Sequence, residues 1–307
     1  MTLQIDWLRG CATALVTPFR ADGSVDIERL RNLVEFQIQS GIRMLVPCGT
    51  TGESATMSDE EDQLVIKTVI ETAAGRAKVI AGTGSNSTAV AIQYSQTARE
   101  LGADAVLSVA PYYNKPTQEG LYAHFTAIAK SVSDLPIVIY NVPGRTSSNI
   151  SAETTLRLAN DNENIVAVKE ASGNLSQIME ILRSRPAGFR VISGDDSLTL
   201  AIIALGGDGL ISVASNEIPA LMNELNELAL AGKTNEARAL HYRVLPLLEA
   251  NFIESSPGPV KAAMALLGLL DENFRLPLVP VQEKTRARLR EILLDLGVFK
   301  GTSHAAA

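Results

Sequence analysis

The chain has 307 residues, of which 46% are hydrophobic, and a formal net charge of −7. A chain of this length and hydrophobicity can bury a large core, which excludes intrinsic disorder. Its mildly acidic balance, without a basic cluster, argues against nucleic acid as a partner.

Eight short apolar runs alternate with amphipathic stretches over the first three quarters of the chain. The apolar runs, which predict strands, are residues 11–16, 44–47, 78–81, 105–109, 137–140, 165–168, 190–192 and 209–212. The amphipathic stretches, which predict helices, are residues 27–39, 59–72, 89–101, 119–132, 152–158, 175–184, 197–205 and 219–229. Strands that alternate with helices imply a parallel sheet, and eight such units predict an α/β protein with a closed (β/α)8 TIM barrel.

The pattern changes after about residue 231. Residues 235–251, 260–270 and 283–296 predict three helices without intervening strands, and proline and glycine separate these helices. We therefore predict a catalytic barrel over residues 1–231 and a C-terminal three-helix extension over residues 232–307.

Several common functional elements are not expected. The apolar run at residues 11–16 is too short to span a bilayer, and no signal-peptide cleavage site follows it. We therefore expect no membrane partner and a cytoplasmic location. Two cysteines cannot form a disulfide framework, and the three histidines have no metal-ligand spacing, so we expect no metal site.

Lys169 stands at the end of the sixth apolar run, where a barrel enzyme places its chemistry. Lysine is seldom buried without a partner or a purpose, and burial lowers the pKa of an amine and makes it a nucleophile. The alternative is a lysine whose alkyl chain packs in the core while its ammonium reaches water. The residues around Lys169 do not choose between these two possibilities.

Other strand ends carry polar or aromatic side chains. Thr50 and Thr51 stand between two glycines, where accessible N–H groups could hold a small carboxylate or phosphate. Tyr140 ends the fifth run and could relay a proton, and Arg145 beyond it could bind a carboxylate. Tyr113 lies in an aromatic loop that could reach a site or pack against a partner subunit. Each of these residues alone could equally be an ordinary loop or core residue.

Three further polar positions are interpreted as structural. Asp195 and Asp196 could bind Mg²⁺, but they occupy the expected N-cap and first position of a helix. His124 falls within a helical pattern and is expected to be solvated.

Five short segments at these strand ends carry a family resemblance. They are Gly-Thr-Thr-Gly-Glu-Ser at 49–54, Pro-Tyr-Tyr-Asn-Lys-Pro-Thr-Gln-Glu-Gly at 111–120, Tyr-Asn-Val-Pro-Gly-Arg-Thr at 140–146, Val-Lys-Glu-Ala-Ser-Gly-Asn at 168–174 and Ser-Gly-Asp-Asp at 193–196. One segment alone is weak. Five in this order resemble the dihydrodipicolinate synthase (4-hydroxy-tetrahydrodipicolinate synthase) family, a member of the N-acetylneuraminate lyase superfamily of class I pyruvate aldolases.

The resemblance implies an enzyme that condenses pyruvate with L-aspartate 4-semialdehyde to 4-hydroxy-tetrahydrodipicolinate, the committed step toward diaminopimelate and lysine. Lys169 would form a covalent imine with pyruvate, so that no cofactor is needed. Tyr140, Thr50 and Tyr113 are similar to the family's proton relay, with Tyr113 supplied across a subunit interface.

The resemblance also implies how the substrates and subunits are held. Thr51 would bind the pyruvate carboxylate, and Arg145 would meet the carboxylate of aspartate semialdehyde. The backbone carbonyl of Ile211 would shape the pocket near the lysine. The expected assembly is a homotetramer built from tight dimers.

Two alternatives to the synthase activity stay open. A related pyruvate-dependent lyase acting on a sugar acid such as N-acetylneuraminate would share the lysine and the tyrosine, and a barrel could bind a keto acid or a partner without catalysis.

Lysine-inhibited members of the family tend to carry an acidic residue where this chain has Val90, and histidines where it has Asp59 and Asp62. Because valine cannot pair with an ammonium group, we expect weak or absent inhibition by lysine.

Overall fold

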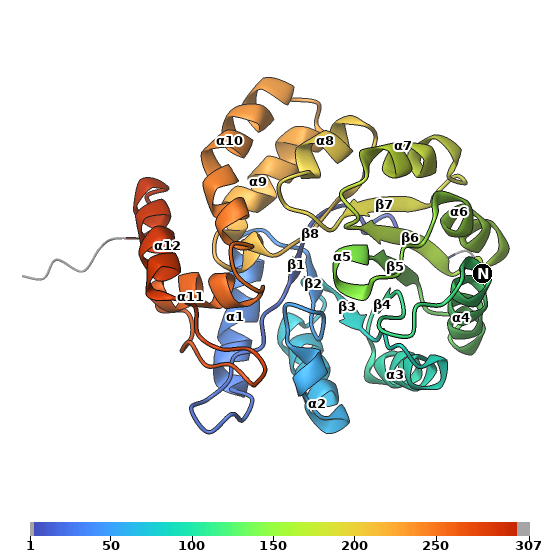
Figure 1. Ribbon diagram of the computed structural model, residues 1–307, viewed down its shortest axis with the longest axis horizontal. Helices are drawn as coiled ribbons and strands as arrows, with labels where there is room; N and C mark the ends of the chain where they lie inside the picture. Colours follow the sequence, from blue (N-terminus) through green and yellow to red (C-terminus); the bar gives the residue numbers. More distant parts are fainter. Residues whose placement is uncertain (1–2, 300–307) are drawn as a thin grey trace, which may run out of the picture.

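The eight apolar runs form eight parallel strands that close into a barrel, in a computed structural model that describes residues 3–299 (Figure 1). The strands are β1 Gly10–Ala14, β2 Met44–Val46, β3 Lys78–Gly82, β4 Ala105–Val109, β5 Ile137–Asn141, β6 Ile165–Glu170, β7 Arg190–Ser193 and β8 Gly209–Ser212. Each strand pairs with the next, and β8 pairs with β1. The predicted TIM barrel is confirmed.

Helices surround the strands (Figure 1). The helices of the barrel are α1 Ile27–Gln39, α2 Asp59–Ala73, α3 Thr88–Leu101, α4 Gln118–Ser131, α5 Pro143–Thr146, α6 Ala152–Asp161, α7 Leu175–Ser184, α8 Thr199–Ala204 and α9 Pro219–Leu230, with 3₁₀ turns η1 Ser54–Thr56 and η2 Ala214–Asn216. Their starts follow local chemistry. Ser58 and Glu61, for example, form a capping box at α2, each side chain accepting from the other residue's N–H.

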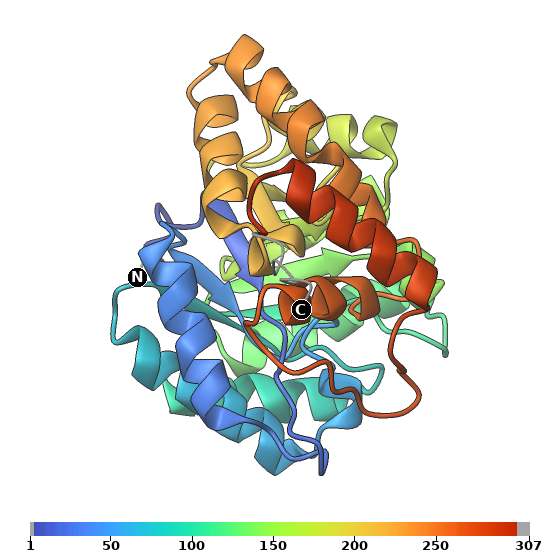
Figure 2. The ribbon, with the colours of Figure 1, turned by 90° about the vertical axis from the view of Figure 1, so that its left-hand side faces the viewer.

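Three further helices, α10 Thr234–Ala250, α11 Gly258–Leu266 and α12 Glu283–Asp295, form the C-terminal extension. Both views place them on one side of the barrel, with α11 beside α1 (Figures 1 and 2). Leu33 of α1 shares an apolar cluster with Val260 and Met264 of α11, so the extension packs directly on the barrel. Between residues 3 and 299, the helices lack the combination of length and apolar character that a membrane span requires.

Strand β6 is two residues longer than its apolar run. Its ladder continues because Lys169 pairs with Tyr140 on β5 and with Ile192 on β7. Glu170, the next residue, points away from the lysine because side chains alternate along a strand. Its buried carboxylate accepts hydrogen bonds from the side chain of Asn141 and the backbone N–H of Ser172. Lys169 therefore lies inside the sheet, where its backbone position is fixed from both sides.

The interpretation of Asp195 and Asp196 as a helix N-cap and first helical residue was wrong. Helix α8 begins only at Thr199, because Asp195 first accepts from the N–H groups of Ser197 and Leu198 in a tight turn. Asp196 is buried, and its Oδ2 accepts from two N–H groups in the loop that follows β8. Its carboxylate therefore joins β7 to the β8 loop instead of starting a helix.

His124 is buried, contrary to the expectation that it is solvated. Its helix α4 packs against α3, and His124 Nδ1 lies 2.9 Å from the hydroxyl of Thr88. Burial lowers the pKa of the His124 imidazole to about 4. The helical period predicts α4 correctly, but α3 and not solvent covers the face of this helix that carries His124.

Candidate active site

Lys169 lies at the carboxyl end of β6 with only 6% of its surface exposed. Its Nζ is 4.2 Å from the centre of the Tyr140 ring on the neighbouring strand. Gly194 leaves room for the lysine chain, because a Cβ there would come within 3.0 Å of Lys169 Cε. The amine is thus held inside the barrel end, and the alternative of an ammonium group in water is wrong for this chain.

The charge of the Lys169 amine is destabilised by its surroundings. Burial lowers the pKa of this amine to about 7, the neighbouring carboxylate of Asp196 opposes the shift, and the guanidinium of Arg145 adds to it. A large fraction of Lys169 is therefore neutral near pH 7, which is the form that attacks a carbonyl.

Tyr140 is buried beside the lysine, in the same apolar cluster inside the barrel as Ile211. Burial raises the pKa of the Tyr140 phenol to about 12, although the charge of Arg145 opposes the shift. The phenol is therefore protonated at neutral pH and can donate a hydrogen bond or a proton to an oxygen bound near Lys169.

The two threonines lie in a tight loop that follows β2. Thr51 is buried and Thr50 is exposed. The loop closes through a hydrogen bond of 3.1 Å from the N–H of Glu53 to the carbonyl of Thr50. The loop also lies close to β3, since a Cβ on Gly82 would stand 2.1 Å from the carbonyl oxygen of Cys48. Only glycine permits this approach, which places the threonines at the carboxyl end of the barrel.

Arg145 lies on the one-turn helix α5 and not on an open loop, because the N–H groups of Arg145 and Thr146 both donate to the carbonyl of Val142. Its Nη2 lies 3.4 Å from the carbonyl oxygen of Ser256, in the segment before α11. Its charge acts on both Lys169 and Tyr140. The guanidinium therefore belongs to the same end of the barrel as the amine and the phenol.

Tyr113 and Ile211 have very different environments. Tyr113 is 89% exposed and adopts a left-handed backbone conformation with φ of 71°. Ile211 is buried in β8, where it pairs with Ala12 of β1. The barrel brings Lys169 and Tyr140 together, while Tyr113 projects from the surface of the chain.

Two buried charged groups at this end of the barrel were not recognised from the sequence. Asp196 was assigned to a helix start, although it acts electrostatically on Lys169. Glu53 forms a fully buried ion pair with Lys261 of α11. A single lysine within the apolar run Val260-Lys-Ala-Ala-Met is the signal in the sequence for the pair of Glu53 with Lys261.

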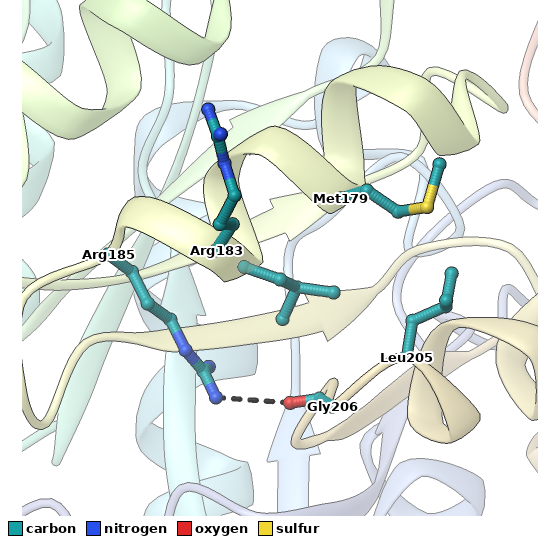
Figure 3. Close-up of a pocket in the computed structure, with 6 residues that line it drawn as sticks. Met179, Arg183, Arg185, Leu205 and Gly206 are labelled. Atoms are coloured by element: carbon teal, nitrogen blue, oxygen red, sulfur yellow. Dashed lines mark hydrogen bonds between the residues drawn. The ribbon is translucent and has the colours of Figure 1, made fainter.

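A surface pocket of about 210 Å³ lies elsewhere, between α7 and α8 (Figure 3). It is lined by Met179, Leu182, Arg183, Arg185, Leu205 and Gly206. Arg185 donates to the carbonyl of Gly206 at 3.0 Å, and these two residues precede β7 and β8. The pocket therefore lies at the amino ends of the strands, opposite to Lys169, where barrel residues serve stability.

Fold and site together define a (β/α)8-barrel enzyme whose strand ends surround a buried amine. Residues 7–296 match the model of the Dihydrodipicolinate synthetase family, and the chain belongs to that family. The resemblance inferred from the five segments is thus confirmed.

Individual relatives agree over nearly the whole chain. A 4-hydroxy-tetrahydrodipicolinate synthase of Koribacter versatilis is 54% identical over 97% of this chain and 99% of its own length. The crystal structure of dihydrodipicolinate synthase from Aquifex aeolicus has a TM-score of 0.93 at 48% identity, covering 94% of this chain and 98% of its own. The chloride-inhibited enzyme of Acinetobacter baumannii, complexed with pyruvate, has a TM-score of 0.93 at 45% identity, covering 95% and 99%. These relatives favour the synthase over a sugar-acid lyase.

Proposed function

We propose that this protein condenses pyruvate with L-aspartate 4-semialdehyde to form 4-hydroxy-tetrahydrodipicolinate, the committed step toward diaminopimelate and lysine. The observation that carries the proposal is the buried amine of Lys169, 4.2 Å from the centre of the Tyr140 ring and with a pKa lowered to about 7. The names of the relatives support the choice of substrates.

The first step joins pyruvate to the enzyme. The neutral amine of Lys169 attacks the keto carbon, and loss of water from the carbinolamine leaves an iminium ion. The iminium accepts the electron pair that remains when a proton leaves the methyl group, which gives an enamine. The enamine carbon then attacks the aldehyde of the second substrate. Because the iminium formed on Lys169 is the electron sink, no cofactor is proposed.

Each proton transfer needs a group that can hold a proton at neutral pH. Tyr140 is suited to donate to the departing hydroxyl of the carbinolamine, since its phenol is protonated and buried. We assign Thr50 and Tyr113 to the same relay, with Tyr113 supplied by a partner subunit. The exposure of Tyr113 supports this role, because a relay residue outside its own barrel needs another chain to cover it.

The carboxylates of the two substrates need different partners. Thr51 and the N–H groups of its loop would hold the carboxylate of pyruvate, since this loop lies at the strand ends next to β3. Arg145 would hold the carboxylate of aspartate semialdehyde in a bidentate pair. The backbone carbonyl of Ile211 would form the wall near the lysine.

We further propose a cytoplasmic homotetramer assembled from tight dimers. Both cysteines are free and buried, as is usual for proteins of a reducing compartment. A dimer is the minimum that places Tyr113 of one subunit at the site of another.

The direct test is a turnover assay with pyruvate and aspartate semialdehyde, in which a reductase consumes the product. N-acetylneuraminate is offered in a parallel reaction. Turnover of the first pair alone supports the proposed reaction. Cleavage of N-acetylneuraminate without turnover of aspartate semialdehyde would contradict it and favour the sugar-acid lyase.

The lowered pKa of Lys169 predicts how imine formation depends on pH. The amine is protonated below a pH of about 7, so the rate of trapping at subsaturating pyruvate should fall roughly tenfold per pH unit below that value and level off above it. The measurement is the rate of reductive trapping with cyanoborohydride across the pH range. A midpoint near the ordinary pKa of lysine would contradict a desolvated amine.

Arg145 should contribute mainly to the second substrate. Replacing Arg145 with alanine removes a charge-assisted pair worth about 1.5–3 kcal/mol, so kcat/KM for aspartate semialdehyde should fall roughly 10- to 100-fold. Steady-state kinetics check this. Pyruvate trapping on the pH plateau above the pKa of Lys169 is the internal control, because loss of the Arg145 charge also shifts that pKa. An unchanged KM for aspartate semialdehyde together with impaired pyruvate trapping would assign the arginine to the first substrate instead.

The response to lysine follows from the residues on α2 and α3. Because Val90 cannot pair with an ammonium group and Asp59 is already bonded by the hydroxyl of Tyr94, we expect weak or absent inhibition. Initial rates measured over a range of lysine concentrations check this expectation. Half-inhibition at sub-millimolar lysine would contradict it.

A further inference from the structure

Lys261 of α11 is a fully buried lysine outside the reaction proposed above. Its side chain has no exposed surface, and burial lowers the pKa of its amine while Glu53 opposes that shift. All three donors of the ammonium are used. They reach the carboxylate of Glu53 at 2.5 Å, the carbonyl of Asn273 at 2.7 Å and the carbonyl of Thr17 at 3.1 Å. The ammonium also lies over the ring of Phe19, 4.6 Å from its centre.

The partner of Lys261 belongs to the threonine loop. Glu53 adopts a left-handed backbone conformation with φ of 57°, and its N–H closes the turn onto the carbonyl of Thr50. Thr17, whose carbonyl Lys261 also binds, donates its hydroxyl to the carbonyl of Gly52 at 2.7 Å. The lysine thus contacts both the segment that follows β1 and the loop itself.

A second cation extends the contact along the same segment. Arg275 forms two short hydrogen bonds with Glu61 and one of 2.9 Å with the carbonyl of Thr56. Its guanidinium lowers the pKa of Glu61 to about 2. Lys261 and Arg275 therefore both bind residues 53–61 from the C-terminal extension.

A gain in folding stability does not explain why the chain carries this buried ion pair. A buried ion pair gains little over an apolar pair of similar volume, because both ions lose their hydration. What the pair does supply is geometry, since a carboxylate and an ammonium with satisfied partners hold a single arrangement. The backbone that Glu53 fixes carries Thr50 and Thr51 only two or three residues away.

We propose that Lys261 and Glu53 are positioning residues for the pyruvate step, through which the C-terminal extension holds Thr50 and Thr51 in their working geometry. The inference rests on the proposed function, because it assumes that the threonine loop binds pyruvate. It assigns a role in catalysis to a helix that contributes no group to the reaction.

The test uses Lys261→Met, Glu53→Gln and the double variant in the full-length protein. Each single variant leaves one buried group without its partner and is expected to unfold more easily, whereas the double variant removes both charges and should recover part of the stability. The pyruvate step should stay impaired in the double variant, with KM for pyruvate raised and borohydride trapping slowed by roughly 10- to 100-fold. Arg286→Met breaks an ion pair with Glu272 in the same extension and serves as the matched control.

The outcomes separate this inference from the proposed function. A double variant that melts close to the wild-type temperature but has wild-type KM and trapping rate would overturn the positioning role and leave only a structural pair. The same loss of pyruvate trapping in Arg286→Met would also overturn it, because the effect would then come from general loosening of the extension. A wild-type protein that fails to trap pyruvate would overturn the proposed function itself and this inference with it.

Discussion

Replacing Lys169 with alanine should abolish both turnover and covalent trapping of pyruvate by borohydride. The loss in turnover should be roughly 10³-fold or more, the scale on which removal of a nucleophile disables an enzyme. Alanine removes the only group in this scheme that forms the imine, and it leaves a small cavity between β5, β6 and β7. Mass spectrometry of the borohydride-treated protein measures the adduct directly and locates the modified peptide.

The control for this prediction is an exposed lysine. Lys130 lies on the solvent side of α4, and Lys130→Ala should be trapped as fast as the wild-type protein. Circular dichroism shows whether the Lys169→Ala barrel is folded. An adduct that persists in folded Lys169→Ala would contradict the assignment and place the imine on another lysine.

The barrel could be predicted because its signal is local. Each strand is a short apolar run with a helical period after it, and the eight predicted strands end within two residues of the observed ones. Lys169 was missed as a strand residue because a cation ends an apolar run, although the ladder continues through it to Glu170. Strand ends set by pairing with neighbours cannot be read from hydrophobicity alone.

The candidate site was predictable in its residue types and less so in its electrostatics. The sequence places Lys169 and Tyr140 after neighbouring strands, and the register then brings them opposite each other. The pair of Glu53 with Lys261 joins positions more than two hundred residues apart, and no local sequence pattern predicts such a contact. The burial of Asp196 likewise depends on the loop that follows β8. Contacts between residues that are distant in the sequence can be identified only in the folded structure.

Tyr113 should be required for turnover but should act from the neighbouring subunit. Its side chain is 89% exposed in its own chain, so the hydroxyl is free to reach the site of a neighbouring subunit. Tyr113→Phe keeps the ring and removes the hydroxyl, so we expect turnover to fall roughly 10²-fold or more, the usual contribution of a proton-transfer group. Pyruvate trapping should change less, since Lys169 is intact.

Mixed assemblies decide whether the hydroxyl acts in trans. In a random mixture of Tyr113→Phe and Lys169→Ala subunits, half of the dimers are mixed, and each mixed dimer has one site with both the lysine and the tyrosine hydroxyl. Turnover should therefore recover to roughly a quarter of the wild-type value, although each variant alone is nearly inactive. Co-expression followed by native mass spectrometry verifies that mixed dimers are present. If they are present and inactive, Tyr113 acts within its own subunit or not at all, since only a shared site can be rebuilt from two broken chains.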